Sequence, residues 1–257
     1  MPRGLNPEFL PSSLLAEYGI TALFSLRTGG ISPPPFDSLN FGLDLGDPEI
    51  NIKTNLDALT KSAALTSLPH QVQQVHGDKL LWCKGSGTMH NEKADILLTD
   101  KAETALAVRT ADCLPILLAD PKTGIAAAIH AGWRGTAAQV VTSAVREMQS
   151  HGVQAENILA SLGPCIGPCC FHVDMITADK LANSTPQAEL QIQRDPEITA
   201  DLREINAMQL INCGLADVHI ERISACTACD NSRFFSYRRD KKLAGRHLAV
   251  VALPRRP

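Results

Sequence analysis

The chain of 257 residues has the composition of an ordinary globular protein, with 44% apolar residues. Together with 20% charged residues, this composition excludes a disordered or fibrous protein. The formal net charge of −3, from 24 Lys and Arg against 27 Asp and Glu, predicts no nucleic-acid partner. No stretch approaches the roughly 18 apolar residues of a membrane span, and Pro and Glu interrupt the N-terminal segment where a signal peptide is apolar. We therefore expect a cytoplasmic protein without a membrane partner.

The apolar pattern predicts an α/β chain in which strands and helices alternate. Strands are expected at residues 20–26, 105–108, 114–118, 125–130, 158–162, 218–223 and 248–253. Helices are expected at 137–148, where apolar residues recur on one face, and at 199–213 before a C-terminal glycine. The polar segment 174–198 has no clear pattern. Interleaved strands and helices with hairpin-like pairs predict a mixed sheet, in one large domain or two small ones.

Three residues at the edges of expected elements form a candidate catalytic zinc site. A catalytic zinc takes three protein ligands from His, Cys or carboxylate and keeps its fourth position for water or substrate. His76, Cys113 and His130 supply such a set, and strand ends are where α/β sheets expose their sites. Gly77 and Gly132 leave room beside the two histidines. Spacing alone leaves open that each histidine is structural.

Four polar residues near these ligands are candidates for catalysis and anion binding. Arg134 falls where a helix is expected to begin, and a helix N-terminus favours an anion such as phosphate; the alternative is a surface Arg paired with a carboxylate. Arg27 ends the first strand and offers a second guanidinium, and Asn40 offers an amide. Asp112 is the candidate catalytic carboxylate that orients a ligand or takes a proton, or else a turn-forming residue.

The eight cysteines contain two further ligand patterns. Cys226 and Cys229 have the C-x-x-C spacing of a zinc site or a redox pair. The second pattern consists of Cys165, Cys169, Cys170 and His172. Together the two could form a closed structural site, but C-x-x-C arises by chance in a cysteine-rich chain, and a turn rather than a helix follows this one. We favour isolated, reduced thiols here.

Five segments, in this order along the chain, resemble one known family. They are residues 73–77, 110–113, 130–135, 163–168 and 234–240. In these motifs the chain is similar to the YfiH-type family, once called laccase-domain or polyphenol oxidases and now described as purine nucleoside phosphorylases related to the mammalian protein FAMIN. Cys165, His172 and Asp174 depart from the family's pattern, which affects the expected substrate preference and leaves the metal ligands unchanged.

The resemblance implies a single α/β domain over residues 1–257, with mixed β-sheet layers and flanking helices. It implies Zn2+, with copper as a substitute, on His76, Cys113 and His130. The implied activity is phosphorolysis of adenosine, inosine, guanosine and methylthioadenosine together with adenosine deamination. The partners are then a small-molecule nucleoside and phosphate, bound by the polar residues named above. A homodimer is left open.

Three alternative functions remain open at this point. The same metal site would suit an amidase that edits peptidoglycan precursors. A copper-dependent polyphenol oxidase fits less well, because eight scattered histidines do not offer the ligand groups of a multicopper enzyme. In a non-catalytic, zinc-stabilised binding protein a partner would supply the fourth ligand, and a nearby fourth ligand from His70, Cys165 or Cys170 would favour this alternative. Neither the preferred nucleoside nor the metal follows from the sequence.

Overall fold

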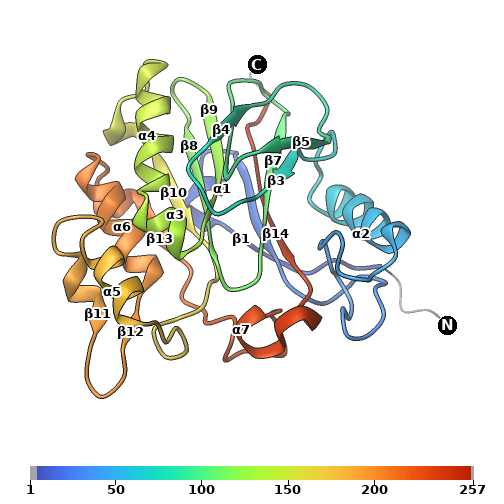
Figure 1. The fold of residues 1–257 in the computed structure, drawn as a ribbon. Coiled ribbons are helices and arrows are strands. Elements are labelled where there is room, and N and C mark those ends of the chain that lie inside the picture. Colours follow the sequence, from blue (N-terminus) through green and yellow to red (C-terminus); the bar gives the residue numbers. More distant parts are fainter. Residues whose placement is uncertain (1–4, 256–257) are drawn as a thin grey trace.

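Two β-sheets lie against each other at the centre of the protein, and helices cover them (Figure 1). The computed structural model describes residues 5–255. The antiparallel four-stranded sheet has the order β1 (Phe9–Pro11), β2 (Thr21–Ser25), β14 (His247–Ala252) and β7 (Ala105–Thr110). The six-stranded sheet has the order β13 (Ile220–Arg222), β10 (Leu159–Leu162), β8 (Leu114–Asp120), β9 (Ile125–Ala131), β6 (Ile96–Thr99) and β4 (Leu80–Trp82). It is mixed, because β13 and β4 pair in parallel with their neighbours.

The remaining elements are shorter or lie outside the two sheets. Two small ladders pair β3 (Gln71–Gln73) with β5 (Met89–Lys93) and β11 (Ile192–Gln193) with β12 (Thr199–Ala200). The α-helices are α1 (Ser13–Ala16), α2 (Glu49–Ser62), α3 (Trp133–Ala137), α4 (Val140–Ser150), α5 (Met175–Ala182), α6 (Leu202–Asn212) and α7 (Tyr237–Asp240). Short 3-10 turns occur at Ala155–Asn157, Ala188–Gln191, Asp217–His219 and Lys241–Leu243.

The alternation of side chains along β8 shows how the layers are held together. Ile116 and Leu118 pack on the side of the helices, whereas Leu117 and Ala119 pack between the two sheets. All four are fully buried. A strand that is buried on both faces carries an unbroken apolar run instead of an alternating one, which is why this run was visible in the sequence.

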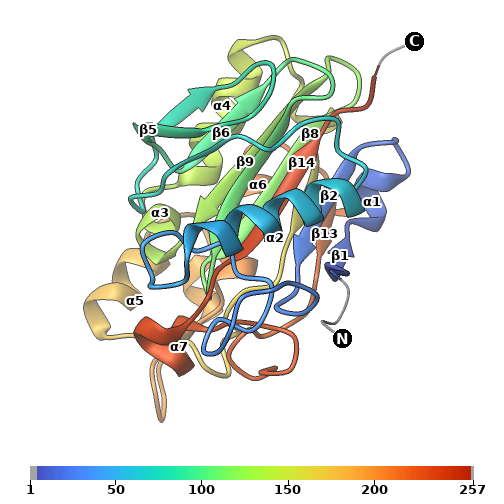
Figure 2. The same cartoon turned by 90° about the vertical axis from the view of Figure 1, so that its right-hand side faces the viewer.

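Helices close the outer face of each sheet. Val141, Val145 and Met148 of α4 pack on the six-stranded sheet, together with Leu210 of α6. On the opposite side, Leu59 of α2 packs on the four-stranded sheet (Figure 2). The order of layers is therefore helix, four-stranded sheet, six-stranded sheet, helices. Within residues 5–255, none of the helices combines the length and the apolar character needed to cross a membrane.

The predicted fold class is confirmed, and each expected strand is present with shifted ends. The prediction of one continuous helix at 137–148 is wrong, because two helices, α3 and α4, occupy this region with a break between them. Gln139 in the break has a φ of 58°, in the left-handed region. The expected helix at 199–213 is shorter than predicted. Residues 199–200 belong to β12. Helix α6 begins at Leu202, and the side chain of Asp201 caps it by accepting hydrogen bonds from the backbone N–H groups of Arg203 and Glu204.

Candidate metal centre

The three predicted metal ligands meet at one end of the sheets. Their candidate ligand atoms all lie within 4.8 Å of one another, and Cys113 Sγ lies 3.8 Å from His76 Nε2. Cys113 occupies the short connection from β7 to β8, and His130 lies in β9 next to β8. His76 follows β3 with a φ of 61°, which turns the loop back over the strand ends. The folding of these elements thus assembles a group that is spread over more than fifty residues of sequence.

Asp95, which the sequence analysis missed, orients both histidines. Its carboxylate accepts hydrogen bonds from the backbone N–H of Val75, His76 and Gly77 at 3.1, 3.0 and 2.7 Å. It also lies 2.7 Å from Nδ1 of His130, which leaves Nε2 of that ring for a metal. A carboxylate behind a ligand histidine is the usual arrangement in metal sites. Asp95 precedes β6 as a single acidic residue, so no local pattern marks it.

The electrostatics of the group favour a thiolate at Cys113. Burial raises the pKa of the Cys113 thiol, but the charge of His130 and hydrogen bonds from His130 and His76 outweigh burial and lower the pKa to about 6. Burial lowers the pKa of His130, but Cys113 and Asp95 outweigh it and raise that pKa to about 9. Because the thiolate is the form that binds metals, the surrounding residues prepare Cys113 for this role.

Space around the three ligands is kept free by Gly132. A Cβ atom at this position would lie 2.8 Å from Cδ2 of His76 and 2.9 Å from Sγ of Cys113, closer than real Cβ contacts. Two imidazoles, one thiolate and a carboxylate behind one imidazole match the donor set of a catalytic zinc. The residues present therefore fit a metal ion of this kind.

The described residues offer no fourth protein ligand to this group. Of the candidates named from the sequence, His70 is hydrogen bonded to His90 at 2.8 Å and belongs to a separate group with Cys83. Cys165 is fully buried and lies 3.5 Å from the guanidinium of Arg203. Cys170 lies among other cysteines. None of the three residues whose presence here would favour a zinc-stabilised binding protein therefore belongs to this group.

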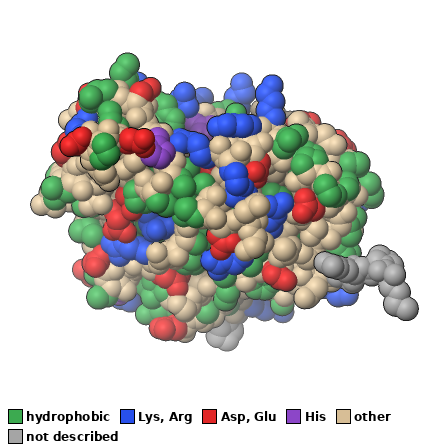
Figure 3. All heavy atoms as spheres, turned by 90° about the horizontal axis from the view of Figure 1, so that it is seen from below, with side chains coloured by type: hydrophobic (Ala, Val, Ile, Leu, Met, Phe, Trp, Pro, Cys, Tyr) green, Lys and Arg blue, Asp and Glu red, His purple; other side chains and the backbone are tan. Residues whose placement is uncertain are grey.

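A cavity of about 770 Å³ opens over the metal ligands. This volume is in the range of small-molecule sites. Its cationic lining residues are Arg109, Arg134, Arg238, Lys241 and Arg246. Its aromatic lining residues are Trp133, Phe171 and Tyr237, and its acidic ones are Asp44, Glu49 and Asp112. On the end of the molecule that carries α7, Lys and Arg side chains are grouped in the upper part of the surface (Figure 3). The cavity therefore suits an anionic substrate with a flat ring.

Asp112 lines the cavity, but both of its carboxylate oxygens accept hydrogen bonds from other groups of the protein. Oδ1 accepts a hydrogen bond from the hydroxyl of Thr227 at 2.6 Å, and Oδ2 accepts bonds from the Ser236 hydroxyl at 3.0 Å and the Arg238 backbone N–H at 2.6 Å. Asp112 has a φ of 84°, an uncommon conformation for a residue with a side chain. These bonds tie the segment around Thr227 and the start of α7 to the loop that carries Cys113.

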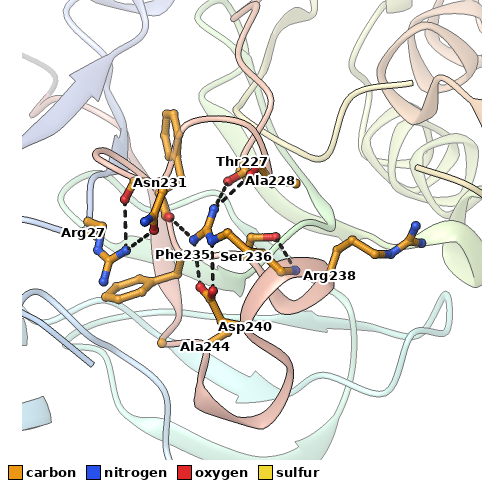
Figure 4. A network of polar contacts seen from close by, with 12 residues as sticks. Arg27, Thr227, Ala228, Asn231, Phe235, Ser236, Arg238, Asp240 and Ala244 are labelled. Atoms are coloured by element: carbon orange, nitrogen blue, oxygen red, sulfur yellow. Dashed lines mark hydrogen bonds and ion pairs between the residues drawn. The ribbon is translucent and has the colours of Figure 1, made fainter. Parts of the chain in front are cut away.

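The other three predicted site residues are not brought together. Arg134 is exposed in the second position of α3, lines the cavity and stacks on the Trp133 ring at 4.3 Å. Arg27 is not among the lining residues, because its guanidinium contacts Asn231 and lies over Phe235 (Figure 4). It is also paired with Asp37 at 3.5 Å.

Asn40 is also absent from the cavity lining. It is fully buried, donates to Asp47 at 2.9 Å, and accepts from the backbone N–H groups of Gly42 and Arg246, both at 2.8 Å. These contacts hold its loop to the segment before β14. Its assignment as a substrate-binding residue, like that of Arg27, stays a prediction that these contacts do not support.

Comparison with known proteins places the chain in a family. Residues 21–254 match the family described as multi-copper polyphenol oxidoreductase laccase. The chain is 35% identical over 247 residues to the purine nucleoside phosphorylase YlmD of Geobacillus stearothermophilus, covering 91% of this chain and 90% of that protein. It is 37% identical over 224 residues to the purine nucleoside phosphorylase YfiH of Escherichia coli, covering 87% and 90%. The chain belongs to this laccase-like YfiH family, as predicted.

Solved structures show the same fold. The crystal structure of YlmD from Geobacillus stearothermophilus superposes with a TM-score of 0.87 at 31% sequence identity, covering 99% of this chain and 98% of the other. The YfiH protein of Bacillus licheniformis also gives a TM-score of 0.87 at 31% identity. The two stacked sheets and their helices are thus common to these proteins.

Proposed function

We propose that the chain is a zinc-dependent purine nucleoside phosphorylase that also deaminates adenosine, with residues 1–257 as one catalytic domain. The proposed substrates are adenosine, inosine, guanosine and methylthioadenosine, with phosphate. The observation that carries this proposal is a three-residue metal group in the wall of a basic cavity with aromatic rings. Relatives over most of the chain are named purine nucleoside phosphorylases, which supports it.

The cationic wall is the proposed phosphate site. Arg109 and Arg246 are mostly buried, so burial lowers the pKa of each, yet both remain charged near neutral pH. Poorly hydrated guanidinium groups bind phosphate strongly and position it for attack at the ribose C1′. Arg134 has no carboxylate partner among the contacts of residues 5–255, so its charge is available to the same anion. These cations would stabilise the charge of the transition state.

The aromatic side chains and Asp112 have separate proposed roles. Tyr237 is half exposed at the cavity, and with Trp133 it offers a flat surface for a purine. Asp112, predicted to pass a proton, is hydrogen bonded through both oxygens, and we therefore propose that it positions Cys113 and Arg238. When bound, zinc supplies a Lewis acid that polarises a substrate oxygen or activates water.

Phosphate dependence tests the phosphorylase. Metal-replete protein is incubated with inosine, with and without phosphate, and hypoxanthine and ribose 1-phosphate are measured. We expect both products only with phosphate. Hypoxanthine released at the same rate without phosphate would exclude phosphorolysis.

Deamination is measured separately, as inosine formed from adenosine in phosphate-free buffer. If no inosine forms, the deaminase part of the proposal is wrong.

Replacing the thiolate ligand tests the role of the metal. Cys113→Ala should lower both activities by more than about 100-fold, because loss of a ligand exceeds the 10–100-fold effect of losing a residue that only orients one. Cys213→Ala, at the end of α6, is the control and should retain full activity. Steady-state rates and zinc content of the purified variants provide the measurement. Full activity in metal-free Cys113→Ala would contradict a metal-dependent mechanism.

The family's description motivates a direct test of metal identity. Apo-protein is reloaded with either Zn2+ or Cu2+ and assayed for phosphorolysis of inosine and for oxidation of a phenol. We expect nucleoside turnover with zinc and negligible phenol oxidation with copper. Phenol oxidation at the rate of nucleoside turnover would favour the copper-dependent oxidase.

A further inference from the structure

Four cysteines that the metal centre does not use come together in the structure. The Sγ atoms of Cys169, Cys170, Cys226 and Cys229 all lie within 4.8 Å of one another. Cys229 Sγ lies 3.5 Å from that of Cys169 and 3.4 Å from that of Cys170. The two pairs come from turns separated by more than fifty residues, so the cluster is a product of folding and not of local spacing.

The spacing of the sulfur atoms matches a tetrahedral metal site. With zinc–sulfur distances of about 2.3 Å, neighbouring sulfurs of a four-cysteine site lie about 3.8 Å apart. A disulfide requires about 2.05 Å between its sulfur atoms and joins only two of them. The observed separations of 3.4 and 3.5 Å are near the edge length of the metal site and far from that of a disulfide.

The backbone around the cluster is built to hold it. The backbone N–H of Gly167 donates to Sγ of Cys226 at 3.2 Å, and such bonds stabilise thiolate ligands. A Cβ at Gly167 would lie 3.3 Å from Cβ of Cys226 and 3.4 Å from Sγ of Cys169, so a larger residue would crowd the sulfurs. Cys165 pairs with Cys226 as an isolated β-bridge, which sets the two turns side by side.

Two arginines hold the same two turns in place through hydrogen bonds to backbone carbonyl oxygens. Arg238 donates to the carbonyl oxygens of Cys170 and His172 at 2.8 and 3.0 Å. Arg239 donates to the carbonyl oxygens of Thr227 and Ala228, both at 3.1 Å, and these two residues appear in Figure 4. A metal with four thiolates would carry a net charge of −2, which the positive charge of Arg238, held against the first turn, would partly offset. The charge of Arg239 is paired with Asp240 at 2.8 Å, so its role at the cluster is to hold the second turn.

From this arrangement we propose that Cys169, Cys170, Cys226 and Cys229 bind a second zinc ion in a closed, structural site. Four protein ligands leave no position for substrate, which distinguishes this site from the open group of His76, Cys113 and His130. Cys165 and His172, the other members of the sequence pattern, are not ligands: Cys165 contacts Arg203, and His172 is paired with Glu197 at 2.7 Å.

The proposed site supports the wall of the cavity. Thr227, between the two ligands of the second turn, donates to Asp112, the neighbour of Cys113. Ile166 and Phe171 flank the first turn and line the cavity. The second zinc would hold these segments in place without contacting the substrate. The inference concerns metal binding alone and does not depend on the proposed enzymatic function.

Zinc stoichiometry of the full chain tests the proposal. We expect two zinc ions per wild-type chain by native mass spectrometry and elemental analysis, and one in His76→Ala/His130→Ala. Adding Cys226→Ser/Cys229→Ser to that variant should remove the last zinc. A zinc that persists in the combined variant would place it elsewhere, such as at His70, Cys83 and His90, and would overturn the proposal. One zinc in the wild type and none in the histidine variant would also overturn it.

A labelling experiment on the wild-type protein avoids any variant that fails to fold. Cys169 and Cys229 are exposed, so a maleimide should label them after zinc is removed by a chelator and much more slowly when zinc is restored. Cys213, which is partly exposed and outside the cluster, is the internal control with metal-independent labelling. Equal labelling of Cys169 and Cys229 with and without zinc, or a disulfide from Cys229 in protein isolated without reductant, would contradict the site.

Discussion

The carboxylate of Asp95 orients the two histidines of the candidate metal centre through hydrogen bonds. Asp95 receives four donors on two oxygens, three from the backbone around His76 and one from the ring of His130. Burial raises the pKa of Asp95, but these hydrogen bonds outweigh it, so the pKa lies below the usual value and the carboxylate stays ionised. One side chain therefore fixes two ligands that come from different elements.

Asp95→Asn tests this role. The amide replaces one acceptor oxygen with an NH2 group that faces donors, so both histidines lose their orientation. We expect zinc affinity at the first site to fall by about 10–100-fold, measured by competition with a chelator. Asp100→Asn, at the exposed far end of β6, is the matched control and should bind as the wild type. Unchanged affinity in Asp95→Asn would show that the strands alone position the ligands.

His247 gives the stability a defined pH dependence. Burial lowers its pKa to about 4, and its Nε2 accepts a hydrogen bond from the backbone N–H of Phe235 at 2.8 Å, which protonation of that nitrogen would break. The unfolded chain takes up this proton near pH 6.5, so it binds more protons than the folded chain between these values. The contribution of His247 to the free energy of unfolding should be fully present above pH 6.5. The free energy of unfolding should then fall by roughly 3 kcal/mol as the pH drops to about 4.

The variant His247→Gln isolates this contribution. Glutamine keeps an acceptor for the Phe235 N–H but cannot take up a proton in this range, so the slope between pH 6.5 and about 4 should flatten. Urea unfolding at several pH values measures it, with the surface variant His151→Gln as a control that keeps the wild-type slope. An identical slope in His247→Gln would assign the effect to another group.

At the scale of elements, the connection from β9 into α3 forms the tightest part of the centre. Gly132 is the N-cap residue directly before α3 and faces His76 and Cys113. Gly132→Ala should push these ligands apart and reduce zinc affinity by at least about tenfold, while Gly77→Ala, whose Cβ would make ordinary contacts at 3.7 Å, should retain it. Chelator competition compares the two. Equal affinity in both variants would mean that the loop relaxes freely.

Elements and sites differed in how well the sequence predicted them. The buried runs of β8 and β9 were predicted correctly, because burial on both faces leaves a local signal. The three candidate metal ligands could be selected as polar residues at strand ends, and the structure brings them together. Helix α2 was missed because its buried stripe is narrow and contains Asn55 between Ile52 and Leu59. The contacts of Arg27 with Asn231 depend on which way a loop side chain points, and only the fold determines that.

At the scale of the whole molecule, stability depends on the contact between the two sheets. Leu117 is fully buried there. Leu117→Ala should lower the free energy of unfolding by about 2–5 kcal/mol, because the rigid sheets cannot close the cavity that it leaves. The control Leu190→Ala, at a residue 75% exposed, should change it by less than about 0.5 kcal/mol. Denaturant unfolding compares the two, and a similar small loss in both would place the main core elsewhere.

The position of β14 has a consequence for the synthesis of the protein. This strand lies between β2 and β7, yet it comprises residues 247–252, whereas β2 starts at residue 21. Until residue 252 has left the ribosome, the backbone edges of β2 and β7 that pair with β14 therefore have no partner strand. During translation the apolar strands β2 and β7 have no central partner, which makes the growing chain a natural client for chaperones that bind apolar segments.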